Sequence, residues 1–402
     1  MRFSAPAALA AWASVVVADT ASPTATDVAD VEAAAATAIS QSPVSHVKGK
    51  TFDRYVSIWF ENTDYDTAAG DPNFAYFASK GLTLENLFAV THPSQPNYLA
   101  SITGDYFGLN GDWFNAVPEN ISSTIDLLED KGISWAMYEE DMPYTGFQGV
   151  EYINQETGAN DYVRKHNPAV MLNSVVNSES RLERIKNTTL FFEDLEANTL
   201  PQWMFITPNM TDDGHDSSVT TAGTWLRWFL DPLLTNPNFM NNTLVLLTFD
   251  ENENYAIRNN VFSVLLGDAL PASLVGQSDT TYYNHYSEIA TVEANWNLST
   301  LGRWDVGANV FSPVAQNGSD KARTWSGDPS FDEMFFNYSY DGIFNHDSYA
   351  PQPVPNVELV RNGRSVLGSV VANWSSQESQ TYYKDQVEIP DGFHPPVYPD
   401  SS

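Results

Sequence analysis

The chain has 402 residues, enough for one large α/β catalytic domain or for two smaller domains. Its 51 acidic and 19 basic residues give a formal charge of −32, and the absence of any basic run argues against nucleic acid or an anionic membrane surface as a partner. The chain contains no cysteine, which excludes disulfides, thiol nucleophiles and thiolate metal sites.

The first residues have the pattern of a secretory signal peptide, with Arg2 as the positive charge, an apolar run over residues 7–17 and small residues up to Ala18. A buried N-terminal helix is the alternative. We expect residues 1–18 to be the signal peptide and residues 19–50, which lack aromatic side chains, to be a propeptide or mobile arm. The mature protein would then be secreted, extracellular or in the cell wall, without stable membrane association because no later stretch is long and apolar enough to span a membrane.

N-glycosylation acceptor patterns agree with secretion, so we expect N-linked glycans. They lie at Asn120, Asn187, Asn209, Asn241, Asn297, Asn317, Asn337 and Asn373. Asn209 falls inside a candidate active-site segment and is expected to stay unmodified.

From residue 52 onward, strand-like and helix-like segments alternate along the chain. The clearest strands are the continuous apolar runs Arg54–Phe60 and Leu244–Phe249, which indicate strands covered on both faces. In chain order, further strands are expected at 82–90, 133–138, 203–206 and 261–266, and helices at 71–81, 96–103, 123–132, 219–230 and 285–298. This alternation predicts an α/β fold with a mostly parallel sheet between two helical layers.

The pattern loosens after Arg303, where Ser, Asn, Asp and Pro dominate. We expect residues 51–310 to form the catalytic domain and residues 311–402 to be an irregular C-terminal extension packed on it. Within the extension, Asn362-Gly363 predicts the turn of one hairpin.

Polar residues follow directly after the two clearest strands. Glu61-Asn62 comes after the first, and Asp250-Glu251 after the second. Ligands of open α/β sheets gather beyond the carboxyl ends of the strands, and crowded carboxylates are relieved by a divalent cation. These four residues are therefore candidate metal ligands, with ordinary turn chemistry as the alternative.

The segment around Ser94 offers a candidate nucleophile. Ser94 stands just before a predicted helix that starts with Pro96, so it is either an N-cap residue or a nucleophile at an anion-binding helix terminus. A nearby cation would lower the pKa of its hydroxyl. His92 is either a donor to phosphate or a loop histidine.

Two further segments contain histidines that could serve the same edge. Asp213 and His215 lie in an acidic loop after the strand at 203–206, where His215 would bind phosphate or protonate a leaving alkoxide. His285 stands at the head of the last predicted helix. For the segment with Asp213 and His215, the alternative is an ordinary polar loop. For His285, it is a helix-start histidine without a ligand.

Together these segments resemble the phosphoesterase family that contains fungal secreted acid phosphatases and bacterial and plant phospholipases C. The resemblance runs from about residue 55 to 303. The segments are Phe60-Glu61-Asn62, His92-Pro93-Ser94-Gln95-Pro96-Asn97-Tyr98, Asp213-Gly214-His215-Asp216, Phe249-Asp250-Glu251-Asn252, and His285 with Ser287 and Glu293.

The resemblance implies an alkaline-phosphatase-like α/β/α fold and a divalent metal ion of open identity. It implies a metal site made of Glu61, Asn62, Ser94, Asp250 and Glu251, with Ser94 also as the nucleophile. It further places active-site roles near His92, Asn97, Asp213, His215 and His285.

Two departures separate the chain from the phospholipase branch, which typically has Arg where this chain has Tyr98 and a His where it has Asn252. We therefore expect an acid phosphatase that hydrolyses small phosphate monoesters through a phosphoserine intermediate. A phospholipase C that cleaves phosphodiester head groups and a non-catalytic secreted glycoprotein of the same fold are the alternatives. The sequence leaves the oligomeric state open.

Overall fold

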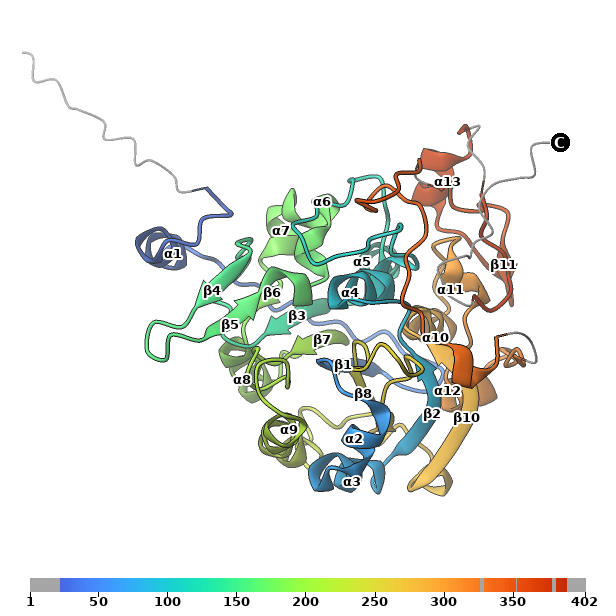
Figure 1. The fold of residues 1–402 in the computed structure, drawn as a ribbon, viewed down its shortest axis with the longest axis horizontal. Helices are drawn as coiled ribbons and strands as arrows, with labels where there is room; N and C mark the ends of the chain where they lie inside the picture. The colour runs from blue at the N-terminus through green and yellow to red at the C-terminus, as the bar shows by residue number, and fades with distance from the viewer. Residues whose placement is uncertain (1–21, 326–328, 352, 378–380, 389–402) are drawn as a thin grey trace, which may run out of the picture.

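A central sheet of eight strands runs through the computed structural model, which describes residues 22–325, 329–351, 353–377 and 381–388 (Figure 1). The strands are β1 (Arg54–Phe60), β2 (Leu82–Phe88), β3 (Trp135–Glu139), β6 (Ile185–Lys186), β7 (Trp203–Thr207), β8 (Thr243–Phe249), β9 (Ser263–Leu266) and β10 (Gln277–Asn284). Their order across the sheet is β10-β2-β9-β8-β1-β7-β3-β6. The expected signal peptide lies outside the described residues.

β1 lies between β7 and β8 and pairs with both in parallel. β9 is the exception to the parallel arrangement, because it pairs antiparallel with both β2 and β8. The expected mostly parallel sheet is therefore confirmed. The register of β1 on β8 pairs Phe60 with Phe249, so Glu61 and Asp250 leave the sheet side by side.

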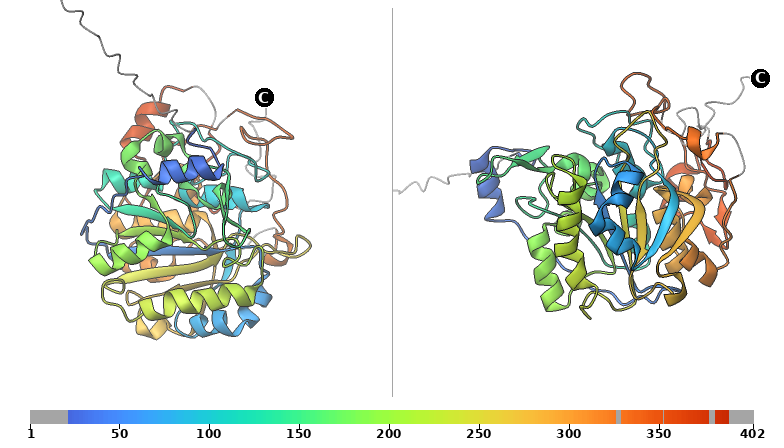
Figure 2. Two further views of the ribbon diagram at one scale, coloured as in Figure 1. Left: turned by 90° about the vertical axis from the view of Figure 1, so that its left-hand side faces the viewer. Right: turned by 60° about the horizontal axis from the view of Figure 1, so that its bottom comes forward.

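Helices cover both faces of the sheet. They are α1 (Val28–Ala35), α2 (Tyr65–Gly70), α3 (Pro72–Ala78), α4 (Ser94–Thr103), α5 (Thr124–Asp130), α6 (Asn173–Val176), α7 (Glu179–Leu182), α8 (Thr188–Ala197), α9 (Val219–Leu233), α10 (Tyr286–Trp296), α11 (Trp304–Gly307), α12 (Ser312–Asn317) and α13 (Gly368–Trp374). Helices α3 and α9 contact each other on one face, and α4 and α10 on the other (Figures 1 and 2). This layering confirms the predicted α/β/α sandwich.

Two small hairpins lie outside the main sheet. One joins β4 (Glu151–Ile153) to β5 (Asn160–Val163), and the other joins β11 (Val360–Arg361) to β12 (Arg364–Ser365). The second is the hairpin predicted at Asn362-Gly363. Both turn residues have positive φ angles of 49° and 80°, as a tight hairpin turn of this type requires.

Helix α4 carries Ser94 and begins two residues earlier than predicted, with Pro93 as its N-cap residue. Every residue of the helix is buried, and Gly104 ends it in the left-handed conformation at φ 75°. Ser94 is therefore the first helical residue rather than the N-cap. Its hydroxyl is free to point toward the ends of the strands instead of capping its own helix.

The segments before and after the sheet domain are attached to it. Ser45 Oγ donates to Gln202 Oε1 at 2.6 Å, and the Val47 N–H donates to the same oxygen at 2.7 Å. In the extension, the hydroxyl groups of Tyr340, Tyr382 and Tyr383 all donate to Asp105, just beyond α4. The end of the expected mobile arm, around Ser45 and Val47, is thus packed on the domain. Removal of the arm as a propeptide stays a prediction.

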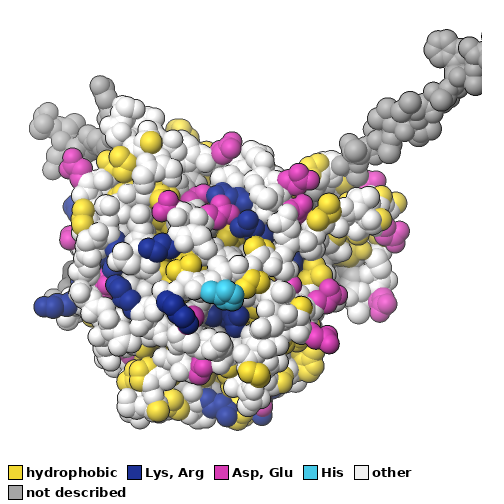
Figure 3. Space-filling view, turned by 180° about the vertical axis from the view of Figure 1, so that it is seen from behind, with side chains coloured by type: hydrophobic (Ala, Val, Ile, Leu, Met, Phe, Trp, Pro, Cys, Tyr) yellow, Lys and Arg dark blue, Asp and Glu magenta, His cyan; other side chains and the backbone are white. Residues whose placement is uncertain are grey.

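The negative net charge is not spread evenly over the surface. Figure 3 shows Lys and Arg side chains gathered over the middle of the face that points away from the viewer in Figure 1. Asn209 is buried, and its Nδ2 donates to Asp141 Oδ2 at 2.7 Å, so this nitrogen is poorly placed to carry a glycan. In the described part of the chain, no helix combines the length and apolar character needed to cross a membrane.

Candidate active site

Four polar side chains meet where β1 and β8 end. The Asn62 N–H donates to Asp250 Oδ1 at 3.1 Å, and Asn62 Nδ2 donates to Glu251 Oε1 at 3.0 Å. Asn62 has a φ of 23°, an unusual conformation for a residue with a side chain, which these bonds help to hold. Glu61, Asp250 and Glu251 are fully buried. The structure therefore brings the four predicted ligands together, while metal binding itself stays a prediction.

Ser94 joins this cluster from α4. Its Oγ donates to Glu61 Oε2 at 3.0 Å and lies 3.4 Å from Asn62 Oδ1. Pro96 has no N–H, and the Gln95 N–H donates to Asp112 Oδ1 at 3.0 Å. Among the first three residues of the helix, only the N–H of Ser94 is therefore left to bind an anion. The sequence had suggested that the helix start would offer several backbone donors.

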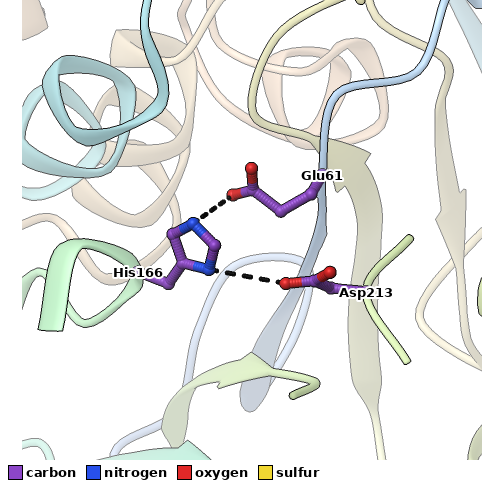
Figure 4. Close-up of side chains that lie close together, drawn as sticks. All are labelled: Glu61, His166 and Asp213. Atoms are coloured by element: carbon purple, nitrogen blue, oxygen red, sulfur yellow. Dashed lines mark ion pairs between the residues drawn. The ribbon is translucent and has the colours of Figure 1, made fainter. Parts of the chain in front are cut away.

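His166 lies between Glu61 and Asp213, and the sequence analysis missed it. It belongs to the short 3₁₀ helix Arg164–His166; its Nε2 is 3.0 Å from Glu61 Oε1, and its Nδ1 is 3.4 Å from Asp213 Oδ2 (Figure 4). One ligand atom from each of the three residues lies within 4.8 Å of the others, a spacing that could also hold a metal ion.

In the triad of Glu61, His166 and Asp213, the histidine forms an ion pair with Glu61, and the carboxyl group of Asp213 lies on its other side. Burial would lower the pKa of His166, but Glu61 and Asp213 raise it to about 9. Burial would raise the pKa of Glu61, but the His166 charge lowers it to about 2. Burial raises the pKa of Asp213 to about 6, although its bond to His166 opposes the rise. His166 is therefore a cation at acidic and neutral pH.

Tyr98 is a second residue whose part in the site was not foreseen. Its hydroxyl donates to Glu61 Oε1 at 2.7 Å, and its ring stacks on His166 with 5.1 Å between ring centroids. The sequence analysis quoted Tyr98 as the end of a family segment and as a departure from the phospholipase pattern, without giving it a role in the site. The structure shows that it holds the carboxylate that accepts the Ser94 hydrogen bond.

His92 supports Glu251 from the other side of the cluster. Its Nδ1 lies 2.6 Å from Glu251 Oε2, and its ring stacks on Tyr255 at 3.7 Å. Burial lowers the pKa of His92 to about 3, so the ring is neutral at acidic and neutral pH above that value. Asn97 acts within the loop before Ser94, because its side chain bonds to the backbone of Val90 and Thr91. Asn97 therefore shapes the loop rather than facing the cluster.

The two remaining predicted histidines occupy different depths. His285 is fully buried, its Nε2 lies 2.7 Å from the backbone oxygen of Asp250, and burial lowers its pKa to about 4. It therefore supports the loop after β8 from beneath. His215 lies at the rim with 30% of its side chain exposed, and its Nδ1 is 2.7 Å from Asp216 Oδ1.

The carboxylate cluster fits a divalent cation. Burial, together with the Glu61 charge, raises the pKa of Asp250 well above its usual range, and burial with the Asp250 charge does the same for Glu251. Asp250 Oδ2 is buried without a donor in hydrogen-bond geometry among the described residues. A hard cation would satisfy this oxygen and offset the repulsion.

The Phosphoesterase family matches residues 69–299, which include Ser94, His166, Asp213, Asp250 and most of the sheet. The chain belongs to this family. The match confirms the expected resemblance, and with it that this phosphoesterase is an enzyme that hydrolyses phosphoric esters.

Relatives extend the similarity over most of the chain. A probable acid phosphatase from Kluyveromyces lactis is 50% identical over 88% of this chain and 84% of its own length. A phosphate-repressible acid phosphatase from Penicillium chrysogenum is 48% identical over 88% of this chain and 85% of its own. These relatives place the phosphoesterase beside fungal acid phosphatases, as the sequence indicated.

Among solved structures, the phosphoesterase is similar to a protein in the alkaline phosphatase superfamily from Vibrio parahaemolyticus. The identity is 11%, the TM-score is 0.41, and the similarity covers 66% of this chain and 73% of that one. The expected α/β/α sandwich with a mostly parallel sheet is confirmed by this chain's own eight-stranded sheet and two helical layers.

Proposed function

We propose that the chain is a secreted, metal-dependent acid phosphatase that hydrolyses phosphate monoesters through a phosphoserine intermediate at Ser94. The observation that supports this best is the position of Ser94, which is 1% exposed at the start of α4 and whose hydroxyl donates to Glu61 in a cluster of buried carboxylates. The names of the fungal relatives support the reaction class.

The proposed cation site consists of Glu61, Asn62, Ser94, Asp250 and Glu251. When bound, a divalent cation would lower the pKa of the Ser94 hydroxyl and polarise the phosphoryl oxygens. His166 shares Glu61 with this site but carries its proton between two carboxylates, so we assign it to Glu61 and Asp213 rather than to the cation.

The chain's own residues can then be assigned to the chemistry. Ser94 Oγ passes its proton to Glu61, the acceptor of its hydrogen bond, as it attacks phosphorus. The new P–O bond forms while the bond to the leaving oxygen breaks. His215, at the exposed rim, donates a proton to the leaving oxygen. In the second half of the reaction, water attacks phosphorus, the P–Oγ bond breaks, and Ser94 Oγ regains a proton as phosphate leaves.

The remaining groups act as positioning residues. Tyr98 and His166 orient Glu61, the acceptor of the Ser94 hydrogen bond. His92 orients Glu251, and His285 supports the Asp250 backbone. We expect substitutions of these residues to lower the rate, because they disturb the groups around Ser94, but not to remove the attacking oxygen.

The test is Ser94→Ala, assayed with a chromogenic phosphate monoester. We expect turnover to fall by about 10³-fold or more, because the attacking oxygen is removed. Ser101→Ala is the matched control, since Ser101 is buried on the same helix and its Oγ donates to the backbone oxygen of Tyr98. Full turnover by folded Ser94→Ala would overturn the proposal.

A further inference from the structure

A cavity of 320 Å³ lies beside the first turn of α4. Its wall includes Gln95, the residue after Ser94, and Lys165, the residue before His166. The cavity therefore shares two wall segments with the candidate active site. Its volume falls at the lower end of the range of roughly 300–1,000 Å³ that is usual for small-molecule sites.

Part of the lining of this cavity is charged. Lys165 Nζ lies 3.0 Å from Asp112 Oδ2 and 3.5 Å from His215 Nε2. The other oxygen of Asp112 accepts the Gln95 N–H, which ties the lysine to the helix of the nucleophile. Burial would lower the pKa of Lys165, but Glu61, Asp112 and Asp250 raise it. Lys165 thus contributes a paired cation to the wall of the cavity.

The rest of the cavity lining is mostly aromatic and apolar, with Glu151 and Arg164 as its further charged residues. Trp113 and Phe114 line it together with Val150 and Val163. The Phe114 ring is 51% exposed, and the guanidinium of Arg164 lies 4.6 Å from its centroid. Such a ring beside a cavity offers a flat surface that a planar ligand could cover.

The C-terminal extension holds one of these rings in place. His346 stacks on Trp113 with 3.6 Å between centroids and an interplanar angle of 11°. The His346 N–H donates to Asn110 Oδ1 at 3.0 Å, which ties the extension to the loop that carries Trp113. Because this support covers part of the indole and fixes its orientation, the wall is formed before a ligand arrives.

We propose that this cavity is the subsite for the leaving alcohol and that it favours aryl phosphates, with the alcohol's ring against Trp113 and Phe114. This proposal rests on the proposed function. With phosphorus at Ser94, Lys165 faces the phosphoryl oxygens at the boundary. The bond from phosphorus to the aryl oxygen breaks, and that oxygen leaves with the bonding electrons and takes a proton from His215. The aryl alcohol is then released into the cavity.

The experiment compares 2-naphthyl phosphate with glycerol 2-phosphate in wild type, Trp113→Ala and Phe114→Ala. We expect kcat/KM for the naphthyl ester to fall by about tenfold in each variant, and that for the glycerol ester to change by less than about twofold. Inhibition of glycerol ester hydrolysis by 2-naphthol should weaken by a similar factor. This second readout reports binding of the alcohol alone.

Trp228→Ala is the control, because Trp228 is 60% exposed on α9 and does not line this cavity. Phe114→Ala guards against misfolding, since its ring is half exposed. Equal losses on both esters, or no loss on either, would overturn the subsite while leaving the phosphatase in place. If wild type hydrolysed neither ester, the proposed function would fail, and the subsite with it.

Discussion

Replacing Glu288 with Gln should flatten the dependence of stability on pH. Glu288 lies on α10 and is buried against β1, where its carboxyl group accepts hydrogen bonds from Ser57 Oγ at 2.7 Å, Tyr55 OH at 3.1 Å and Trp59 Nε1 at 3.1 Å. Burial raises its pKa from 4.5 to about 7, although these donors oppose the rise. The folded protein therefore binds this proton more tightly than the unfolded chain does.

The sign and size follow from proton linkage. Below pH 4.5 the group is protonated in both states, and its contribution to stability is fully present. As pH rises to about 7, the unfolded chain loses the proton while the folded protein keeps it, so stability falls. At about 1.4 kcal/mol for each factor of ten in proton affinity, the loss is about 3 kcal/mol.

The assay is urea unfolding at several pH values between about 4.5 and 7.5, with the free energy of unfolding extrapolated to water. Glu288→Gln should lose about 3 kcal/mol less than wild type across this range, whatever constant offset the amide introduces. Glu193→Gln, an exposed change on α8, should follow wild type. Equal slopes for Glu288→Gln and wild type would refute the reasoning.

Removing the divalent cation with a chelator should abolish turnover, and adding the cation back should restore it; full turnover in protein shown to be metal-free would contradict the proposed site. His92→Ala should lower kcat by about 10- to 100-fold, because Glu251 loses its partner at 2.6 Å. Steady-state kinetics at constant metal content measure this change, and an unchanged kcat would show that His92 is only a loop residue. Tyr383→Phe should lower the free energy of unfolding by about 1–2 kcal/mol, because Asp105 loses a buried donor. Urea unfolding measures this change, and an unchanged midpoint would show that the hydrogen bond from Tyr383 to Asp105 does not stabilise the fold.

The predictable parts of the fold are those whose continuous apolar sequence indicates that they are buried. The runs Arg54–Phe60 and Leu244–Phe249 are apolar throughout, and they form the centre of the sheet. The edge strand Gln277–Asn284 was missed because its first residues are polar and mostly exposed. Its strand form comes from pairing with Leu82–Phe88, a contact between distant segments that local patterns do not carry.

The candidate site divides along the same line. Glu61 and Asp250 could be found because they directly follow strands, where parallel sheets gather ligands. His166 could not be found this way, since it lies in an irregular segment and reaches the site only through tertiary packing. One signal was available: Arg164, Lys165 and His166 are three adjacent basic residues, too few to count as a basic run but unusual in a strongly acidic chain.

The central claim is that Ser94 becomes covalently phosphorylated. The direct measurement is acid quenching of wild-type enzyme during turnover of a monoester labelled in its phosphate, followed by peptide mapping. The account predicts that the label appears on Ser94 and is absent from Ser94→Ala. Label on another residue, or turnover through an intermediate that never leaves label on the protein, would contradict it.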